Sequence, residues 1–305
     1  MRSSLRATFA VAAAAAVVIT LTEPATRTAG YARLVEWWHA NWPSPHGAYL
    51  PLRFASTLET LRIAPPVRVQ VDKGVNLFLD PRDVVSRSIL ATGFWERDTV
   101  IWIDQHLPAG GTFIDVGAHI GFHSLKAAQR VGTAGHVLSV EPNPATLREL
   151  RENVASSKVP QIAIEPVACS DRRATLDLFA SNRSNTGMAS LSSRNAARDD
   201  EGTRSYKVEA VPLDELVERQ GLTRVDVIKI DVEGAETMVL RGAAKTIARF
   251  HPVVVMEMLD DQLRAMNSSV LELELMMTQA GYQRGRKAED NVEWVPLTIT
   301  SSSKP

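Results

Sequence analysis

The sequence predicts an α/β protein with a mostly parallel β-sheet and helices on its faces. From Thr112 onward, short apolar runs alternate with helical stretches, which is typical of a parallel sheet. The first of these runs ends in an acid and a glycine-bearing turn that opens a helix. Turns of this kind build ligand sites at the carboxyl ends of parallel strands.

Five apolar runs are the strand candidates of this sheet. They are residues 113–116, 136–140, 162–167, 225–230 and 252–258. Toward the C-terminus, the pattern predicts an amphipathic helix near residues 268–279 and a last strand at residues 292–299. Ahead of the sheet, residues 67–71 and 75–79 alternate apolar and polar side chains around a glycine turn, which predicts a small β-hairpin.

Composition excludes several classes of protein. The 305 residues are 45% hydrophobic, which is enough for a substantial core without disulfides or metals. Lys and Arg total 34 against 35 for Asp and Glu, so the chain lacks the basic footprint of a nucleic-acid binder. Cys169 is the single cysteine, and no Cys/His cluster has zinc spacing, so we expect neither an internal disulfide nor a metal ion.

The N-terminus has features of a targeting segment. Arg2 and Arg6 precede an apolar run over residues 7–21, which is typical of a signal peptide but also fits a membrane anchor or a docking helix. We expect the main domain in the cytoplasm, with membrane association through residues 7–21 as the open alternative. The expected segments are a leader or anchor (1–30), an extension with the hairpin (31–92), the main domain (93–299) and a tail (300–305).

Two other segments leave alternatives open. Trp37, Trp38 and Trp42 could pack an accessory helix on the domain, lie in a membrane interface or line a substrate site. Residues 181–205 are polar and poor in apolar side chains. They are either a mobile loop that covers a substrate or disordered surface.

The glycine-bearing turn supplies the first candidate ligand contacts, which are Asp115, Gly117, His119 and Gly121. Its spacing departs from the G-x-G-x-x-G pattern that seats a pyrophosphate on a helix N-terminus. The ligand is therefore expected to lack phosphates.

Acids recur after the next two strand candidates. Glu141 stands where a carboxylate can accept both ribose hydroxyls of an adenosine, and Asn143 follows in the same loop. Asp171 follows the third candidate and could accept a hydrogen bond from an adenine amino group. Taken alone, each acid could instead cap a turn or a helix.

These residues resemble the FkbM family of methyltransferases. The resemblance rests on Phe-Ile-Asp-Val-Gly-Ala-His-Ile-Gly-Phe at 113–122, Val-Glu-Pro-Asn-Pro at 140–144, Val-Pro-Leu-Asp-Glu-Leu at 211–216 and Ile-Lys-Ile-Asp-Val-Glu-Gly-Ala-Glu at 228–236. It implies a class I methyltransferase fold with a seven-stranded sheet, S-adenosylmethionine as methyl donor, and a hydroxyl of a sugar, polyketide or similar small metabolite as acceptor. Members of the family commonly have Asn at the position of His119 and an aromatic residue at that of His123.

The end of the fourth strand candidate holds the expected catalytic residues. An alcohol acceptor needs a base as the new bond forms, and Asp231 is our first choice, with Glu233 and His119 as alternatives. Asp231 and Glu233 could also share a divalent ion, or Lys229 and Arg241 could neutralise them in a structural network. The Asn/Asp-Pro-Pro-aromatic motif of many amino-methylating enzymes is missing here, which favours oxygen as acceptor atom.

Two rival functions remain at this point. A nicotinamide-dependent oxidoreductase would share an acid after the second strand, but it needs the phosphate-binding glycine turn. A catalytically inactive, membrane-tethered binding scaffold is the second rival, and the presence of Asp115, Glu141, Asp171 and Asp231 argues against it.

Overall fold

The computed structural model describes residues 31–33, 35–36, 66–181, 187–197 and 203–297. The chain divides into two compact units, with the boundary between Trp95 and Glu96. Residues 7–21, the three N-terminal tryptophans and the tail at 300–305 lie outside the described residues. Within the described ranges, no helix has the length and apolar character needed to cross a membrane.

The described part of the first unit includes the predicted hairpin and helix α4. β1 (Val67–Asp72) pairs antiparallel with β2 (Val75–Leu79), and the connecting turn places Gly74 at φ 80°, a left-handed conformation that glycine adopts without steric cost. The alternating apolar residues Val67, Val69, Val75, Leu77 and Leu79 are buried, whereas Val71 and Phe78 are half-buried. α4 (Val84–Thr92) follows, and its N-cap residue Asp83 accepts a hydrogen bond from the Ser86 amide.

The second unit is built on a seven-stranded sheet with the order β11-β12-β10-β9-β3-β4-β5. Its strands are β3 (Thr112–Val116), β4 (His136–Val140), β5 (Ile162–Glu165), β9 (Val227–Ile230), β10 (Val253–Glu257), β11 (Tyr282–Ala288) and β12 (Asn291–Pro296). β12 is antiparallel to its neighbours β10 and β11. The neighbouring strands among β10, β9, β3, β4 and β5 are all parallel. This order, with one antiparallel strand beside the edge, is that of the class I methyltransferase fold and confirms the predicted fold class.

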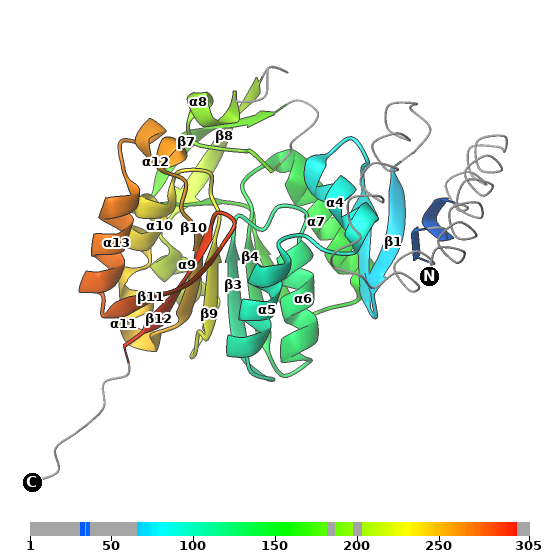
Figure 1. Cartoon of the computed structure of the whole chain (residues 1–305), viewed down its shortest axis with the longest axis horizontal. Coiled ribbons are helices and arrows are strands. Elements are labelled where there is room, and N and C mark those ends of the chain that lie inside the picture. The colour runs from blue at the N-terminus through cyan, green and yellow to red at the C-terminus, as the bar shows by residue number, and fades with distance from the viewer. Residues whose placement is uncertain (1–30, 34, 37–65, 182–186, 198–202, 298–305) are drawn as a thin grey trace, which may run out of the picture. The chain divides into compact units, whose positions relative to one another are not determined.

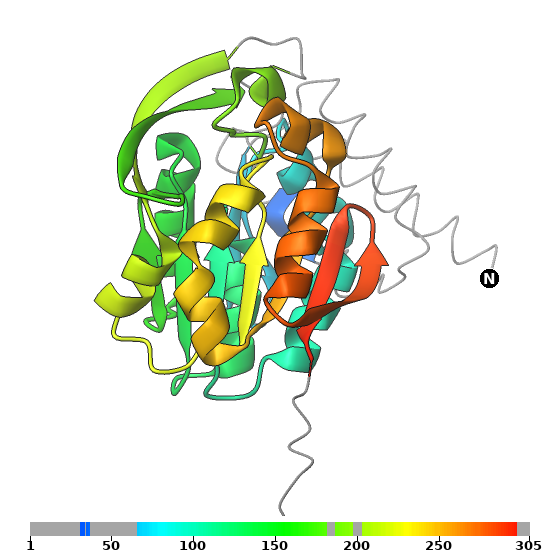
Figure 2. The same cartoon turned by 90° about the vertical axis from the view of Figure 1, so that its left-hand side faces the viewer.

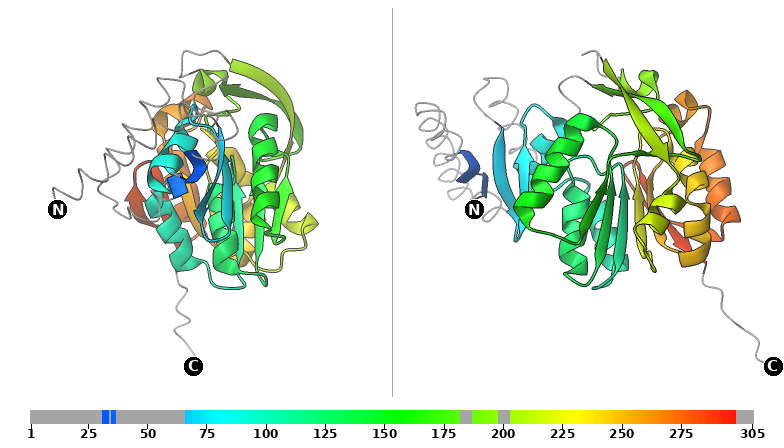
Figure 3. Two further views of the ribbon diagram at one scale, coloured as in Figure 1. Left: turned by 90° about the vertical axis from the view of Figure 1, so that its right-hand side faces the viewer. Right: turned by 180° about the vertical axis from the view of Figure 1, so that it is seen from behind.

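Helices cover both faces of this sheet (Figure 1; Figure 3), as expected for parallel strands that are apolar on both sides. They are α5 (Arg97–His106), α6 (Phe122–Val131), α7 (Pro144–Ser157), α9 (Leu213–Arg219), α10 (Glu236–Gly242), α11 (Ala244–Phe250), α12 (Asp260–Ala265) and α13 (Val270–Gln279). Figure 1 shows α5 and α6 on one side and α10, α11 and α13 on the other. The predicted C-terminal helix at 268–279 corresponds to α13.

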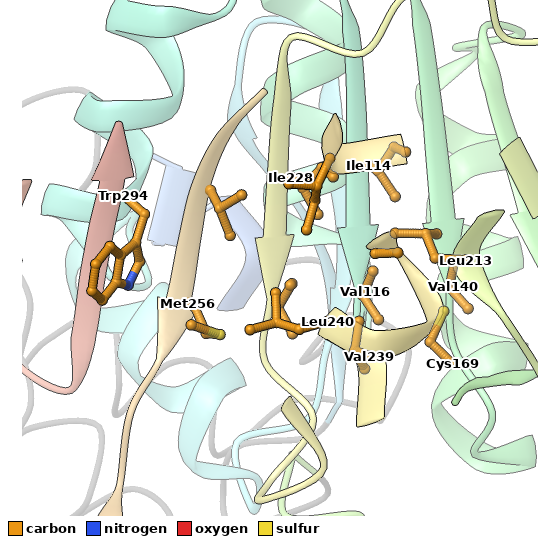
Figure 4. Packing of buried hydrophobic residues seen from close by; sticks show 14 of the residues in the cluster. Ile114, Val116, Val140, Cys169, Leu213, Ile228, Val239, Leu240, Met256 and Trp294 are labelled. Atoms are coloured by element: carbon orange, nitrogen blue, oxygen red, sulfur yellow. The ribbon is translucent and has the colours of Figure 1, made fainter. Parts of the chain in front are cut away.

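The main core lies between the strands and the helices of one face. Side chains of β3, β4, β9 and β10 meet Val239 and Leu240 of α10 (Figure 4), and all of these side chains are almost fully buried. Trp294 of β12 extends the same cluster toward the sheet edge at 2% exposure. This packing holds the carboxyl ends of β3, β9 and β10 in fixed relative positions, which is what the functional site depends on.

A three-stranded sheet with the order β6-β8-β7 was not predicted. β6 (Ala168–Cys169) and β8 (Thr203–Val211) are parallel, and β7 (Ala174–Ser181) pairs antiparallel with β8 as a long curved ribbon (Figure 2). The expected strand at 162–167 therefore ends at Glu165, because the chain leaves the main sheet there.

Residues 187–197 of the polar segment at 181–205 are folded, which excludes the disordered-surface alternative for this part of the segment. These residues form a bridge between Ser190 and Phe179 and a short helix, α8 (Ser193–Ala196). Ser190, Ser192 and Asn195 are buried although the local sequence is polar. Hydrogen bonds from Ser190 and Asn195 to Glu233 and Gln262, and one from the Ser192 amide to Ser190 Oγ, explain this burial.

Candidate active site

The turn after β3 has the strained backbone that its glycines predict. Gly117, His119 and Gly121 have φ values of 85°, 51° and 89°. Asp115, at the end of β3, is 1% exposed, and its Oδ2 accepts a hydrogen bond of 2.6 Å from Ser124 Oγ. Its Oδ1 is buried and has no hydrogen-bond partner within the described part of the chain.

Gly117 is required by the protein's own packing as well as by its φ angle. A Cβ atom at this position would clash with the carbonyl oxygen of Asp231, because the end of β3 runs directly beside the end of β9. A Cβ atom at Gly121 would meet the side chain of Leu150. Both glycines therefore bring protein segments together, so the turn and Asp231 form one continuous surface.

Glu141 is the acid that organises this turn. Its Oε2 accepts the His119 amide at 2.8 Å, and its Oε1 accepts the Asn143 amide and the Thr146 hydroxyl at 2.8 and 2.9 Å. Burial raises the pKa of Glu141, and the nearby His119 and these hydrogen bonds offset part of that rise. A carboxylate has about four acceptor positions, so capacity remains for a ligand hydroxyl.

Two of the expected cofactor contacts have other roles in the structure. Asn143 is 2% exposed and caps α7, where its Oδ1 accepts the Ala145 amide at 3.1 Å. Asp171 follows β6 of the small sheet, which corrects its expected place after a strand of the main sheet. Its carboxylate accepts hydrogen bonds from Arg172 and Ser170.

A cluster of three carboxylates lies at the carboxyl ends of β9 and β10. One oxygen each of Asp231, Glu233 and Glu257 lies within 4.8 Å of the other two. The Asp231 amide donates to Val116 O at 3.0 Å, so the cluster borders the β3 turn. Asp231 and Glu233 were expected from the sequence, whereas Glu257 was missed. Its position as the last residue of a buried strand at this sheet edge would have been enough to predict it.

The cluster has one close ammonium group. Lys229 is 2% exposed, and its Nζ lies 2.7 Å from Asp231 Oδ2 and 3.9 Å from Glu96 Oε2. Burial alone lowers the pKa of Lys229, but Asp231, Glu96 and the more distant Asp115 outweigh burial and raise it. Lys229 therefore neutralises Asp231, as one of the alternatives from the sequence expected. Arg241, the other cation of that alternative, pairs with Glu272 instead.

Glu96 connects Lys229 to a second buried group. Its Oε2 accepts from His123 Nε2 at 3.0 Å, and its Oε1 accepts from Asn291 Nδ2 at 2.9 Å. Burial favours the neutral acid, but Lys229 and His123 outweigh it and lower the pKa of Glu96 to about 2. His123 therefore hydrogen-bonds to Glu96, and its ring packs edge-on against Phe122.

The loop that carries Glu233 is held by residues of the folded insert. Glu233 has φ 53°, and its carbonyl oxygen accepts hydrogen bonds from Ser190 Oγ at 2.7 Å and Asn195 Nδ2 at 2.9 Å. Gln262 Nε2 donates to the carboxylate of Glu233. The next residue, Gly234, has no room for a side chain, because a Cβ there would clash with Asn195 and Gln262.

Burial affects the pKa of Glu257 in the cluster and of Glu236, a fully buried acid beside it. Glu236 is 1% exposed, and burial raises its pKa to about 7, although the Gly234 and Val232 amides bonded to its Oε1 oppose the rise. Burial, followed by the charges of Asp231, Glu233 and Glu236, raises the pKa of Glu257 well above its usual value.

The relatives found among known proteins match only part of this chain. The chain is similar to the AMB antimetabolite synthetase AmbE of Pseudomonas aeruginosa, with 26% identity over 196 residues, covering 54% of this chain and 9% of AmbE. It is also similar to the hexuronic acid methyltransferase AglP of Haloferax volcanii, with 29% identity over 161 residues, covering 52% of this chain and 56% of AglP. The chain thus spans about half of AglP and a small part of AmbE.

Among solved structures, the methyltransferase FkbM of Methylobacillus flagellatus has 16% identity and a TM-score of 0.43 over 70% of this chain and 55% of its own. A model of the FkbM methyltransferase domain matches residues 115–284. The match begins at Asp115 of β3 and ends within β11. That match covers more than half of the 305 residues. The chain therefore belongs to the family of FkbM methyltransferase domains, and its cofactor is S-adenosylmethionine.

Proposed function

We propose that this domain transfers the methyl group of S-adenosylmethionine to a hydroxyl oxygen of a small hydroxylated metabolite, with carbohydrates as the first candidate class. The observation that carries the proposal is the carboxylate cluster of Asp231, Glu233 and Glu257 beside the β3 turn. Carboxylates accept hydrogen bonds from several hydroxyl groups at once, which suits a polyol. The similarity to AglP, a hexuronic acid methyltransferase, supports the same class.

Cofactor binding is assigned to the β3 turn and to Glu141. The unpartnered Oδ1 of Asp115 and the remaining acceptor position of Glu141 fit a ligand that carries an ammonium group and a ribose hydroxyl. The His119 amide fixes the Glu141 carboxylate from the turn side. We retain Gly117 and Gly121 as residues that shape the turn, and Asn143 as the cap that orients α7.

The reaction needs alignment and removal of one proton. The sulfonium of the bound cofactor supplies an electrophilic methyl group. The acceptor oxygen forms the new bond to the methyl carbon while the carbon–sulfur bond breaks. The electron pair of the broken bond stays on sulfur. The acceptor's proton passes to Asp231, whose Oδ2 is held by Lys229 and whose Oδ1 is assigned to the acceptor.

The test is a methyl-transfer assay on the full chain with S-adenosylmethionine and a panel of neutral sugars, uronic acids and simple amines. Release of S-adenosylhomocysteine measures turnover, and mass spectrometry identifies the product. Alkali distinguishes the products, because it cleaves a methyl ester and leaves a methyl ether intact. Methyl ethers are the expected product, whereas methylation of amines alone would overturn the proposal.

Two variants identify the base. Asp231→Asn should lower turnover by about 10² to 10⁴-fold, the usual contribution of a general base. Asp177→Asn changes an exposed acid of β7 that pairs with Lys207, and it should leave turnover unchanged. Equal turnover in both variants would exclude Asp231 as the base.

A further inference from the structure

We propose that Asp231, Glu233 and Glu257 bind a divalent cation of the Mg²⁺ or Mn²⁺ class. These carboxylates come from the end of β9, the following loop and the end of β10, and one oxygen of each lies within 4.8 Å of the others. Hard divalent ions prefer oxygen ligands, and carboxylates at this spacing can converge on one ion. The ligand set contains no sulfur or imidazole, which disfavours zinc and copper.

A second observation points to a missing ligand at the same place. Glu257 Oε2 is buried, and no group within the described residues forms a hydrogen bond with it. Buried side-chain oxygens in folded proteins nearly always have a partner, so an orphaned one needs an explanation. A cation among the three carboxylates would provide that partner.

The local charge balance also favours a cation. Lys229 Nζ is bonded to Asp231 Oδ2 and lies near Glu96, so its charge is shared by two acids. Glu236 adds another buried carboxyl close enough to act on Glu257. Carboxylates brought together in this way repel one another unless protons or cations balance them.

The protein holds the loop ligand in place before any ion arrives. Ser190 and Asn195 both donate to the carbonyl oxygen of Glu233, and Gln262 orients its carboxylate. Asp231 is fixed by Lys229 and by the bond from its amide to Val116. Ligands that are already oriented lose less conformational freedom on binding, which favours a defined site over loose ion association.

The function of this site rests on the proposed methyl transfer to a hydroxyl group. An ion at this position would bind neighbouring oxygens of the acceptor and orient one of them toward the methyl group. It would also make the acid-rich surface compatible with an acceptor that carries its own carboxylate, such as a uronic acid. No bond of the transfer reaction is made or broken at the ion.

Direct Mn²⁺ binding tests the inference without any acceptor. The full chain, stripped with a chelator, is titrated with Mn²⁺ by calorimetry and by electron paramagnetic resonance, and the same samples are titrated with S-adenosylhomocysteine. We expect one Mn²⁺ site, with affinity reduced at least about tenfold in Glu257→Gln and in Glu233→Gln. Glu209→Gln, an exposed acid of β8, is the control and should bind Mn²⁺ as the wild type does.

The outcomes separate this inference from the proposed function. Intact S-adenosylhomocysteine binding without Mn²⁺ binding would overturn the cation site and leave the methyltransferase proposal standing. Mn²⁺ binding that Glu257→Gln and Glu233→Gln do not weaken would also overturn it, because the ion would then lie elsewhere. Thermal unfolding with and without Mn²⁺ shows that each variant is folded, and only proteins with the site should be stabilised by the ion.

Discussion

Lys229 Nζ and Asp231 Oδ2 form an ion pair of 2.7 Å at the end of β9, and the lysine side chain is 2% exposed. The two residues are separated by one position, so they lie on the same face of an extended segment. A buried ammonium is tolerated only with close anionic partners, and Glu96 is the second one. Through Lys229, the carboxylate cluster beside the β3 turn therefore interacts electrostatically with the buried Glu96.

Replacing Lys229 should destabilise the whole second unit. Lys229→Met leaves Asp231 and Glu96 without their shared cation, and breaking a buried pair costs about 3–5 kcal/mol. Urea unfolding followed by circular dichroism measures the loss. Lys245→Met, at an exposed position on α11, should change the free energy of unfolding by less than about 0.5 kcal/mol. Equal stabilities for the two variants would mean that the buried pair contributes little.

Glu141→Ala should weaken S-adenosylhomocysteine binding by about 1.5–3 kcal/mol, because a charged acceptor for the ribose hydroxyls and for the His119 amide is lost. Isothermal titration calorimetry gives the affinity. The matched control is Thr146→Val, which removes one hydrogen bond to Glu141 Oε1 and leaves its charge in place. Unchanged affinity in a folded Glu141→Ala protein would remove Glu141 from the cofactor site.

The insert should stabilise the Glu233 loop in a non-additive way. Ser190→Ala and Asn195→Ala each leave the Glu233 carbonyl with one donor, so each should cost about 1 kcal/mol. The double variant removes both of these donors and should cost more than the sum, because either donor alone can still partly satisfy the carbonyl. Urea unfolding of the four proteins completes the cycle. The exposed Ser193→Ala is the control, and strict additivity would contradict shared support of one carbonyl.

Stability should decrease in acid through Glu96. The pKa of Glu96 is about 2 in the folded protein against 4.5 for the free side chain, so the unfolded state binds the proton first as pH falls. The stabilisation is complete above pH 4.5 and is lost between pH 4.5 and 2. A shift of this size corresponds to about 3 kcal/mol.

Glu96→Gln isolates this contribution. The variant should be less stable than the wild type at neutral pH, and the difference should shrink as the pH approaches 2. Chemical denaturation at several pH values measures both curves. Parallel curves would show that Glu96 does not titrate in this range.

Local patterns were sufficient to predict most of the fold and part of the site. The apolar runs at 113–116, 136–140 and 252–258 correspond to β3, β4 and β10, because a strand buried on both faces must be apolar throughout. The family motifs predicted the seven-stranded sheet and the cofactor. The three-stranded sheet was missed because β7 and β8 are largely polar at exposed positions.

The sequence by itself determined a glycine turn after a buried strand and acids after the following strand candidates, where we propose that the cofactor binds. Only the tertiary structure decided which acids meet: Glu257 joins Asp231 and Glu233, whereas Asp171 follows a strand of the small sheet. It also decided that Glu96 and Lys229, 133 positions apart, share one buried network. The physical reason is that strand order and packing set these distances, and both depend on contacts between segments remote in sequence.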